Sequence, residues 1–436
     1  MSLAWISVAA LVLAVTLSCT TTINVGVLSL ALALIVGVGL AGMSPGEVLE
    51  GFPVDLLITL VSVTLLFAIA EVNGTLARLT ERAVRLCRGH AGVLPIMFFM
   101  IGFALATIGA GATPASALLA PPAMAVAARA GIPPFLMAIM AGNGALAGTL
   151  SPFAPTGVVS QGVMEDIGLG GVEWWTFAYN AAAHALVGFG GFLLFGGWKL
   201  FRRSAARADA ADVETVEPMD WRHWLTALGI VALISGVTYY ELNVGMVAVI
   251  VATVLVLART VDEAKAIAKM PWGVILMVTG VTVLIALLQE TEGMALITAG
   301  IASLSTPATI EPIVGFGVGL VSVYSSTSGV VLPAFLPMAP ELARQLGGLD
   351  PLPIAWSMNV AASLVDLSSL STAGALHRGR RGLRGHAQAV QSAARVGHVD
   401  DARRRRALLH PVRVTAHPPP APCFEAGTFV SSTANW

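Results

Sequence analysis

The sequence repeats one pattern of apolar runs and breaks at an offset of about 218 residues. Asn24-Val25-Gly26 opens one apolar run, and Asn243-Val244-Gly245 opens another. Each is followed by a Pro-led apolar segment, starting at Pro53 or Pro271, that ends in an acidic stretch containing glycine. The pattern therefore predicts two related halves that share one architecture.

Both halves are too apolar for a water-soluble core, because 56% of the residues are hydrophobic and only 11% are charged. Several windows are long enough to cross the hydrocarbon core of a bilayer as helices. The first window lacks the basic start of a signal peptide, and we interpret it as a retained helix. The expected spans are Ser2–Cys19, Ile23–Ala41, Pro53–Glu71, Trp174–Leu200, Trp224–Tyr240, Val244–Arg259 and Pro271–Gln289.

Small polar residues interrupt each half at two matching places. One is a tip, at Gly111–Ser116 or Ser325–Gly329, and the other is an Asn-containing helix, around Asn143 or Asn359, that runs into small residues. Irregular backbone survives at membrane depth only where it is buried in protein or lines a cavity. We therefore predict an all-α polytopic membrane protein with two inverted-topology repeats, each with a re-entrant hairpin and a broken helix. The alternative is that the small residues only allow close helix packing.

Basic residues gather near Arg78–Arg88, Lys199–Arg207 and Arg259–Lys269, and the positive-inside rule places them on the cytoplasmic face. All three clusters reach one face only if each hairpin enters and leaves on the same side. Each half then crosses the membrane an odd number of times, which inverts one half relative to the other. The predicted boundaries are a first repeat at 1–200, a cytoplasmic linker at 201–220, a second repeat at 221–376 and a basic tail at 377–436.

The tail does not continue the repeat. The offset predicts a last apolar helix near 392–417, but this region contains Arg403-Arg404-Arg405-Arg406 and could not span a bilayer. We interpret 377–436 as the product of a frameshift just after Leu376, which would remove the last helix of the second repeat. A natural basic cytoplasmic tail is the alternative.

Four polar residues in or beside apolar spans are candidates for function. Asp366 lies in the second broken helix, where it could bind a cation, carry a proton or cap the helix. Asp55 is expected to act at a helix N-terminus, and His184 is expected either to pack with a hydrogen bond or to relay protons. Glu71 is expected to be interfacial.

The two tips carry a resemblance to a known group of proteins. Thr113 with Leu119–Met124, and Ser325-Ser326-Thr327 ahead of Leu332-Pro333, resemble the ion transporter superfamily. The Asn-Val-Gly opening and Asn143-Gly144 most resemble the MatC-type dicarboxylate (malonate) carriers, and the resemblance covers about residues 1–376. It implies a homodimer that moves a small dicarboxylate by a cation-coupled elevator motion. In the sodium-coupled branch a Ser-Asn-Thr triplet at each tip binds cation and carboxylate.

The predicted function is secondary active transport of malonate or a C4-dicarboxylate across the inner (plasma) membrane, with Na⁺ or H⁺ as the coupling ion and no cofactor. No P-loop, metal cluster or catalytic pair is evident, so no enzyme is expected. The alternatives are the large membrane subunit of a binding-protein-dependent carboxylate transporter, a cation/proton antiporter and an intramembrane enzyme. The predicted substrate-binding residues are Thr113, Ser116, Asn143, Thr156, Ser326, Thr327, Asn359 and Thr372, and the predicted cation-binding residues are Ser151, Ser325, Ser328, Asp366 and Ser368.

Overall fold

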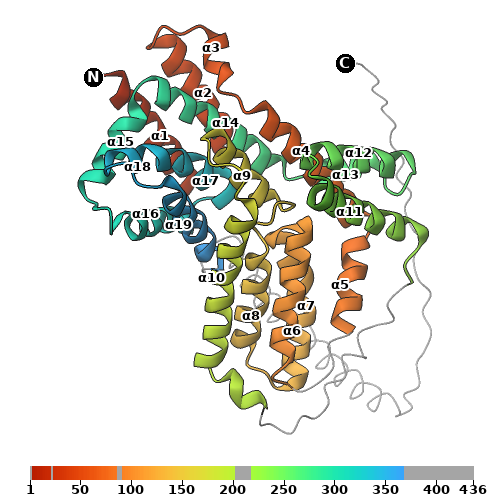
Figure 1. Cartoon of the computed structure of the whole chain (residues 1–436). Helices are drawn as coiled ribbons and strands as arrows, with labels where there is room; N and C mark the ends of the chain where they lie inside the picture. Colours follow the sequence, from red (N-terminus) through yellow and green to blue (C-terminus); the bar gives the residue numbers. More distant parts are fainter. Residues whose placement is uncertain (1, 21–22, 86–90, 202–217, 368–436) are drawn as a thin grey trace, which may run out of the picture. The chain divides into compact units, whose positions relative to one another are not determined.

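The computed structural model describes residues 2–20, 23–85, 91–201 and 218–367, and these residues form helices and connecting segments without a strand (Figure 1). They belong to the first of two compact units, Met1–Gly379. The second unit, Arg380–Trp436, lies outside the described residues, as does the last helix expected near 392–417.

The helices follow the two predicted halves. Those of the first half are α1 (Leu3–Thr20), α2 (Val25–Gly39), α3 (Pro45–Glu50), α4 (Val54–Val72), α5 (Thr75–Arg85), α6 (Leu94–Leu105), η1 (Ala106–Ala110), α7 (Ala112–Ala130), α8 (Pro134–Ala147), α9 (Pro155–Asp166), α10 (Glu173–Leu194) and η2 (Gly197–Phe201). Those of the second half are α11 (Trp221–Tyr240), α12 (Val244–Leu257), α13 (Glu263–Lys269), α14 (Trp272–Glu290), α15 (Gly293–Ser303), α16 (Ile310–Tyr324), η4 (Thr327–Val331), α17 (Leu332–Phe335), η5 (Leu336–Met338), α18 (Ala339–Gln345), α19 (Pro351–Leu364) and η6 (Val365–Leu367).

Among the described residues, four helices are long and apolar enough to cross a membrane: α4, α10, α11 and α14. Shorter apolar helices accompany them, including α2, α8, α12 and α16. These helices fit a multi-pass membrane protein, and their bounds agree with the expected spans to within a few residues, apart from the end of α10 at Leu194. Asp55 lies in the first turn of α4, as expected from the preceding Pro53.

The repeated Asn-Val-Gly motif begins a helix in both halves. The Asn24 side chain accepts a hydrogen bond from the Gly26 amide at 2.9 Å, and the Asn243 side chain accepts one from the Met246 amide at 3.1 Å. Asparagine is a favoured N-cap because its side chain satisfies an amide that has no partner within the helix. The motif therefore specifies the start of α2 and of α12.

The glycine of the same motif lets each of these helices pack on a long helix of the other half. A Cβ on Gly26 would lie 1.8 Å from the Leu276 carbonyl oxygen of α14, and a Cβ on Gly245 would lie 2.8 Å from Thr59 Oγ1 of α4. The contacts are reciprocal, because α2 packs on α14 and α12 packs on α4. Close approach of helix backbones through small residues is the usual packing mode in membranes.

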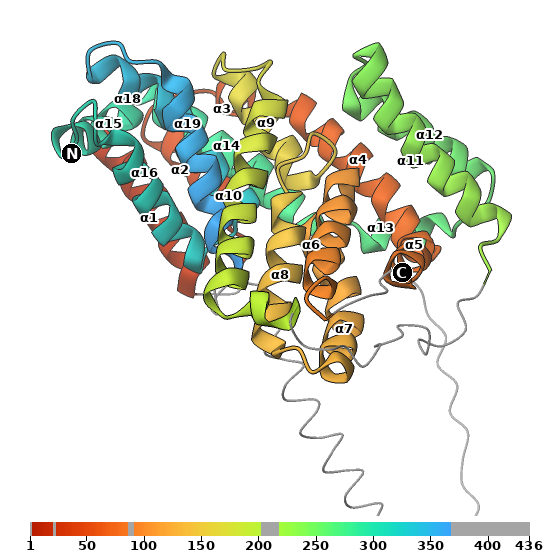
Figure 2. The ribbon, with the colours of Figure 1, turned by 60° about the horizontal axis from the view of Figure 1, so that its bottom comes forward.

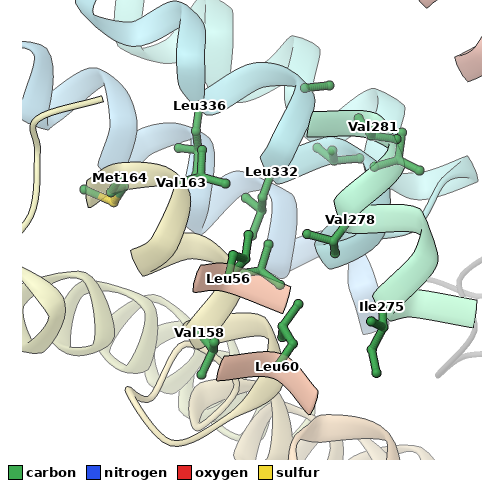
Figure 3. Packing of buried hydrophobic residues seen from close by; sticks show 14 of the residues in the cluster. Leu56, Leu60, Val158, Val163, Met164, Ile275, Val278, Val281, Leu332 and Leu336 are labelled. Carbon is green, nitrogen blue, oxygen red and sulfur yellow. The ribbon is translucent and has the colours of Figure 1, made fainter. Parts of the chain in front are cut away.

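Two apolar clusters organise the unit. The larger joins the two halves, and Figure 3 shows ten of its labelled side chains: Leu56, Leu60, Val158, Val163, Met164, Ile275, Val278, Val281, Leu332 and Leu336. The second cluster lies mainly among α6, α7, α8 and α10, with additional residues from α5 and η2. The four main helices lie side by side in Figures 1 and 2. The broken segments start from these helices and from α16 and α19.

Candidate functional site

The first predicted tip is a break between η1 and α7. Gly109 and Gly111 have positive φ values of 118° and 76°, which side chains rarely adopt, and α7 then begins at Ala112. A Cβ on Gly109 would also lie 2.1 Å from the Phe67 ring of α4. Glycine is required here for both reasons, and Thr113 lies in the first turn of the new helix.

The second tip is a break between α16 and η4. Ser325 and Ser326 have extended backbone, and the Ser326 hydroxyl accepts a hydrogen bond from the Gly329 amide at 3.1 Å. Thr327 therefore begins a new helical turn, just as Ala112 begins α7. In each half, a polar break is followed by a helix N-terminus, where amide groups favour an anion.

The two tips line a single cavity of about 580 Å³. Of the predicted substrate and cation ligands, those that line this cavity are Thr113, Thr156, Ser325, Ser326, Thr327, Ser328 and Asp366. Helix α9 also begins at this cavity, at Pro155. The volume is in the range of small-ligand sites.

Asp366 lies beside the second tip within a compact group of oxygen atoms. Thr327 Oγ1 donates to Asp366 Oδ1 at 2.6 Å and lies 2.7 Å from Ser322 Oγ. Ser322 Oγ also donates to the Ala362 carbonyl at 2.9 Å. A carboxylate, two hydroxyls and a carbonyl are the donors that hard cations prefer.

The first broken helix is connected to the first tip through Ser151. Ser151 Oγ donates to the Thr107 carbonyl of η1 at 2.7 Å and accepts from the Phe153 amide at 3.3 Å. The Thr107 hydroxyl is buried and has no partner among the described residues. Ser151 does not line the cavity, so its place is behind the tip.

Asn143, predicted to bind substrate, lies in a buried polar network away from the cavity lining. Its Oδ1 lies 3.1 Å from His184 Nδ1 of α10, and His184 Nε2 lies 3.3 Å from Ser363 Oγ of α19. Ser363 Oγ donates to Asn180 Oδ1, and Asn180 Nδ2 donates to the Leu146 carbonyl at 3.0 Å. His184 therefore connects helices of both halves by hydrogen bonds, as the packing interpretation predicted.

The remaining predicted residues are placed elsewhere or not described. Asn359 is fully buried, and its Oδ1 accepts from Ser160 Oγ of α9 at 2.6 Å. Ser116 is buried in α7 and does not line the cavity. Ser368 and Thr372 lie outside the described residues.

Several polar residues at the cavity were not predicted from the sequence. Thr64 and Thr149 contribute hydroxyls to its lining, and Lys269 and Glu71 form an ion pair there with 3.0 Å between Lys269 Nζ and Glu71 Oε1. Glu71 is thus more than an interfacial residue at the end of α4. The repeat offset pointed to residues in matching breaks, whereas these four lie in helices or at their ends.

Replacing His184 by Leu is expected to destabilise the unit, because it leaves Asn143 and Ser363 with fewer partners in a buried network. Each buried polar group deprived of its partner costs about 1–3 kcal/mol. The thermal unfolding midpoint of the purified protein should fall clearly. Thr253→Val is the control, because the Thr253 hydroxyl is exposed and bonds only to its own helix at Val249. Equal midpoints for the two variants would contradict a load on the network.

These observations define the class of protein as an all-helical, multi-pass membrane protein with a polar internal cavity. Residues 1–149 match the family model of the dicarboxylate carrier protein MatC N-terminus. The match confirms, for this part of the chain, the MatC-type resemblance predicted from the sequence, and it implies dicarboxylate transport. No curated protein matches the chain.

Proposed function

We propose that this protein is a secondary active transporter that carries a small dicarboxylate, such as malonate or succinate, together with a cation. The observation that carries the proposal is the cavity that joins both tips in a chain whose first 149 residues match a dicarboxylate-carrier domain. A carrier of this kind is consistent with a protein that is not an enzyme.

The proposed substrate site uses groups from both halves. Thr113 and Thr156 lie at the N-terminal ends of α7 and α9, and Ser326 and Thr327 lie at the second tip. Hydroxyls and helix N-termini together suit a carboxylate at either end of a short dianion. Asn143 and Asn359 hold the broken helices from behind in this arrangement.

The proposed cation site is the oxygen group around Asp366. Asp366, Thr327 and Ser322 would bind Na⁺ or exchange a proton, with Ser325 and Ser328 nearby in the cavity lining. A matching position in the first half is the region of Ser151 and the partnerless Thr107 hydroxyl. The cation is a transported substrate in this scheme.

We further propose inverted-topology repeats, alternating access of elevator type, a homodimer and a location in the inner (plasma) membrane. The reciprocal packing of α2 on α14 and of α12 on α4 supports the repeats, because exchanging the halves leaves this pair of contacts unchanged. A cavity that draws on both halves is what alternating access between them requires.

The test is uptake of labelled malonate and succinate into proteoliposomes that contain only this protein, under a sodium gradient, a proton gradient or neither. We expect uptake driven by one of the two gradients. Uptake that appears only after a soluble binding protein is added would instead support the large subunit of a binding-protein-dependent transporter. Cation exchange without any dicarboxylate uptake would support an antiporter.

A further inference from the structure

The cavity contains one ion pair, and the pair joins the two halves. Among the described residues that line the cavity, Lys269 is the only base, and Glu71 and Asp366 are the acids. Lys269 ends α13 of the second half, and Glu71 lies in the last turn of α4 of the first half. The cavity therefore holds a cation that already contacts a carboxylate.

The positions of both side chains are set by packing. Helix α13 packs on α4, with Ala266 fully buried, and the indole of Trp272 donates to the Ile267 carbonyl at 2.8 Å across the turn that contains Lys269. The charged groups themselves remain hydrated, since the Lys269 and Glu71 side chains are 51% and 33% exposed. Hydrated ion pairs are weak, so a carboxylate in the cavity can compete for Lys269.

We propose that Lys269 is a carboxylate-binding residue at the hydrated edge of the cavity, and that an entering dicarboxylate replaces Glu71 as its partner. The inference rests on the proposed function and adds a substrate contact outside the two tips. The exchange conserves charge at Lys269, because one carboxylate takes the place of another. The second carboxylate of the substrate is then free to reach the hydroxyls and helix N-termini of the tips.

Competition makes the two partners act in opposite directions. Removing the charge of Glu71 leaves Lys269 without its internal anion and should strengthen dicarboxylate binding. Removing the charge of Lys269 takes away a contact of the substrate and should weaken binding. A pair that merely fastens α13 to α4 predicts the same direction for both variants, because either change breaks the same contact.

The experiment is equilibrium binding of labelled malonate and succinate to the purified full-length protein and its variants. We expect Lys269→Gln to weaken binding about five- to tenfold and Glu71→Gln to strengthen it about two- to fivefold, in line with one charge-assisted hydrogen bond. Lys269→Arg should keep most of the affinity. Lys265→Gln is the matched control and should change nothing, because Lys265 lies on the same helix, pairs with Asp262 at 3.6 Å and does not line the cavity.

Weaker binding in both Glu71→Gln and Lys269→Gln would overturn the inference in favour of a structural contact. Unchanged affinity in Lys269→Gln, or an equal loss in Lys265→Gln, would overturn it as well. If the unaltered protein binds neither malonate nor succinate, the proposed function itself fails, and the role of Lys269 fails with it. The result for the unaltered protein therefore separates the two failures.

Discussion

Asp366→Asn is expected to reduce cation-driven dicarboxylate uptake about ten- to a hundredfold, the size of a lost charged hydrogen-bond partner. Asparagine keeps the shape of the side chain but removes the charge from the oxygen group formed with Thr327 and Ser322. The measurement is initial uptake into proteoliposomes as a function of the coupling-ion concentration. The cation dependence should shift to much higher concentration or disappear.

Glu311→Gln is the control for this change, because it removes a carboxylate that is exposed in the first turn of α16, away from the cavity lining. It should leave uptake unchanged. Thr327→Ala should resemble Asp366→Asn, since Thr327 donates to Asp366 and is also at the second tip. An Asp366→Asn protein with normal rate and normal cation dependence would show that the cation binds elsewhere.

Gly26→Ala is expected to destabilise the protein by about 3 kcal/mol or more, at the upper end of the range for overpacking. The new methyl group would lie 1.8 Å from the Leu276 carbonyl oxygen, so the backbones of α2 and α14 would have to separate. Thermal unfolding of the purified protein should show a much lower midpoint. Gly280→Ala tests the same crossing from the other side, because its Cβ would lie 2.0 Å from the Gly26 carbonyl oxygen.

Gly39→Ala provides the matched control within α2. A Cβ at Gly39 has no atom within 4 Å, so the same substitution there should change stability by no more than about 1 kcal/mol, in the direction of greater helix propensity. Similar midpoints for Gly26→Ala and Gly39→Ala would contradict the close crossing of α2 and α14.

Much of the helical framework follows from local pattern. An apolar run bounded by Asn24 or Pro53 has few alternatives to a helix in a bilayer, because every backbone group must be satisfied within the segment. The breaks at Gly109–Gly111 and Ser325–Ser326 lie where the polar tips were predicted, since glycine and serine permit the backbone conformations found there. Short helices such as α3, α5 and α13 were not predicted, because their sequences are neither long nor uniformly apolar.

The candidate site was predictable only where its residues are in the breaks. Thr113, Thr156, Ser325–Ser328 and Asp366 line the cavity as the repeat suggested. Asn143 and Asn359 are in equally suggestive places but turn their side chains to His184 and Ser160. Which face of a helix meets the cavity depends on the packing of its neighbours, and a repeat offset contains no information about that rotation.

By itself, the sequence determined that this chain is a multi-pass helical protein with two interrupted halves, because apolar length, helix caps and broken segments are local properties. Only the tertiary structure decided that α2 packs on α14, that both tips meet in one cavity, and that Lys269 faces Glu71 there. The physical reason is that these contacts join residues far apart in the chain, where close helix crossings and the pairing of charges depend on three-dimensional packing.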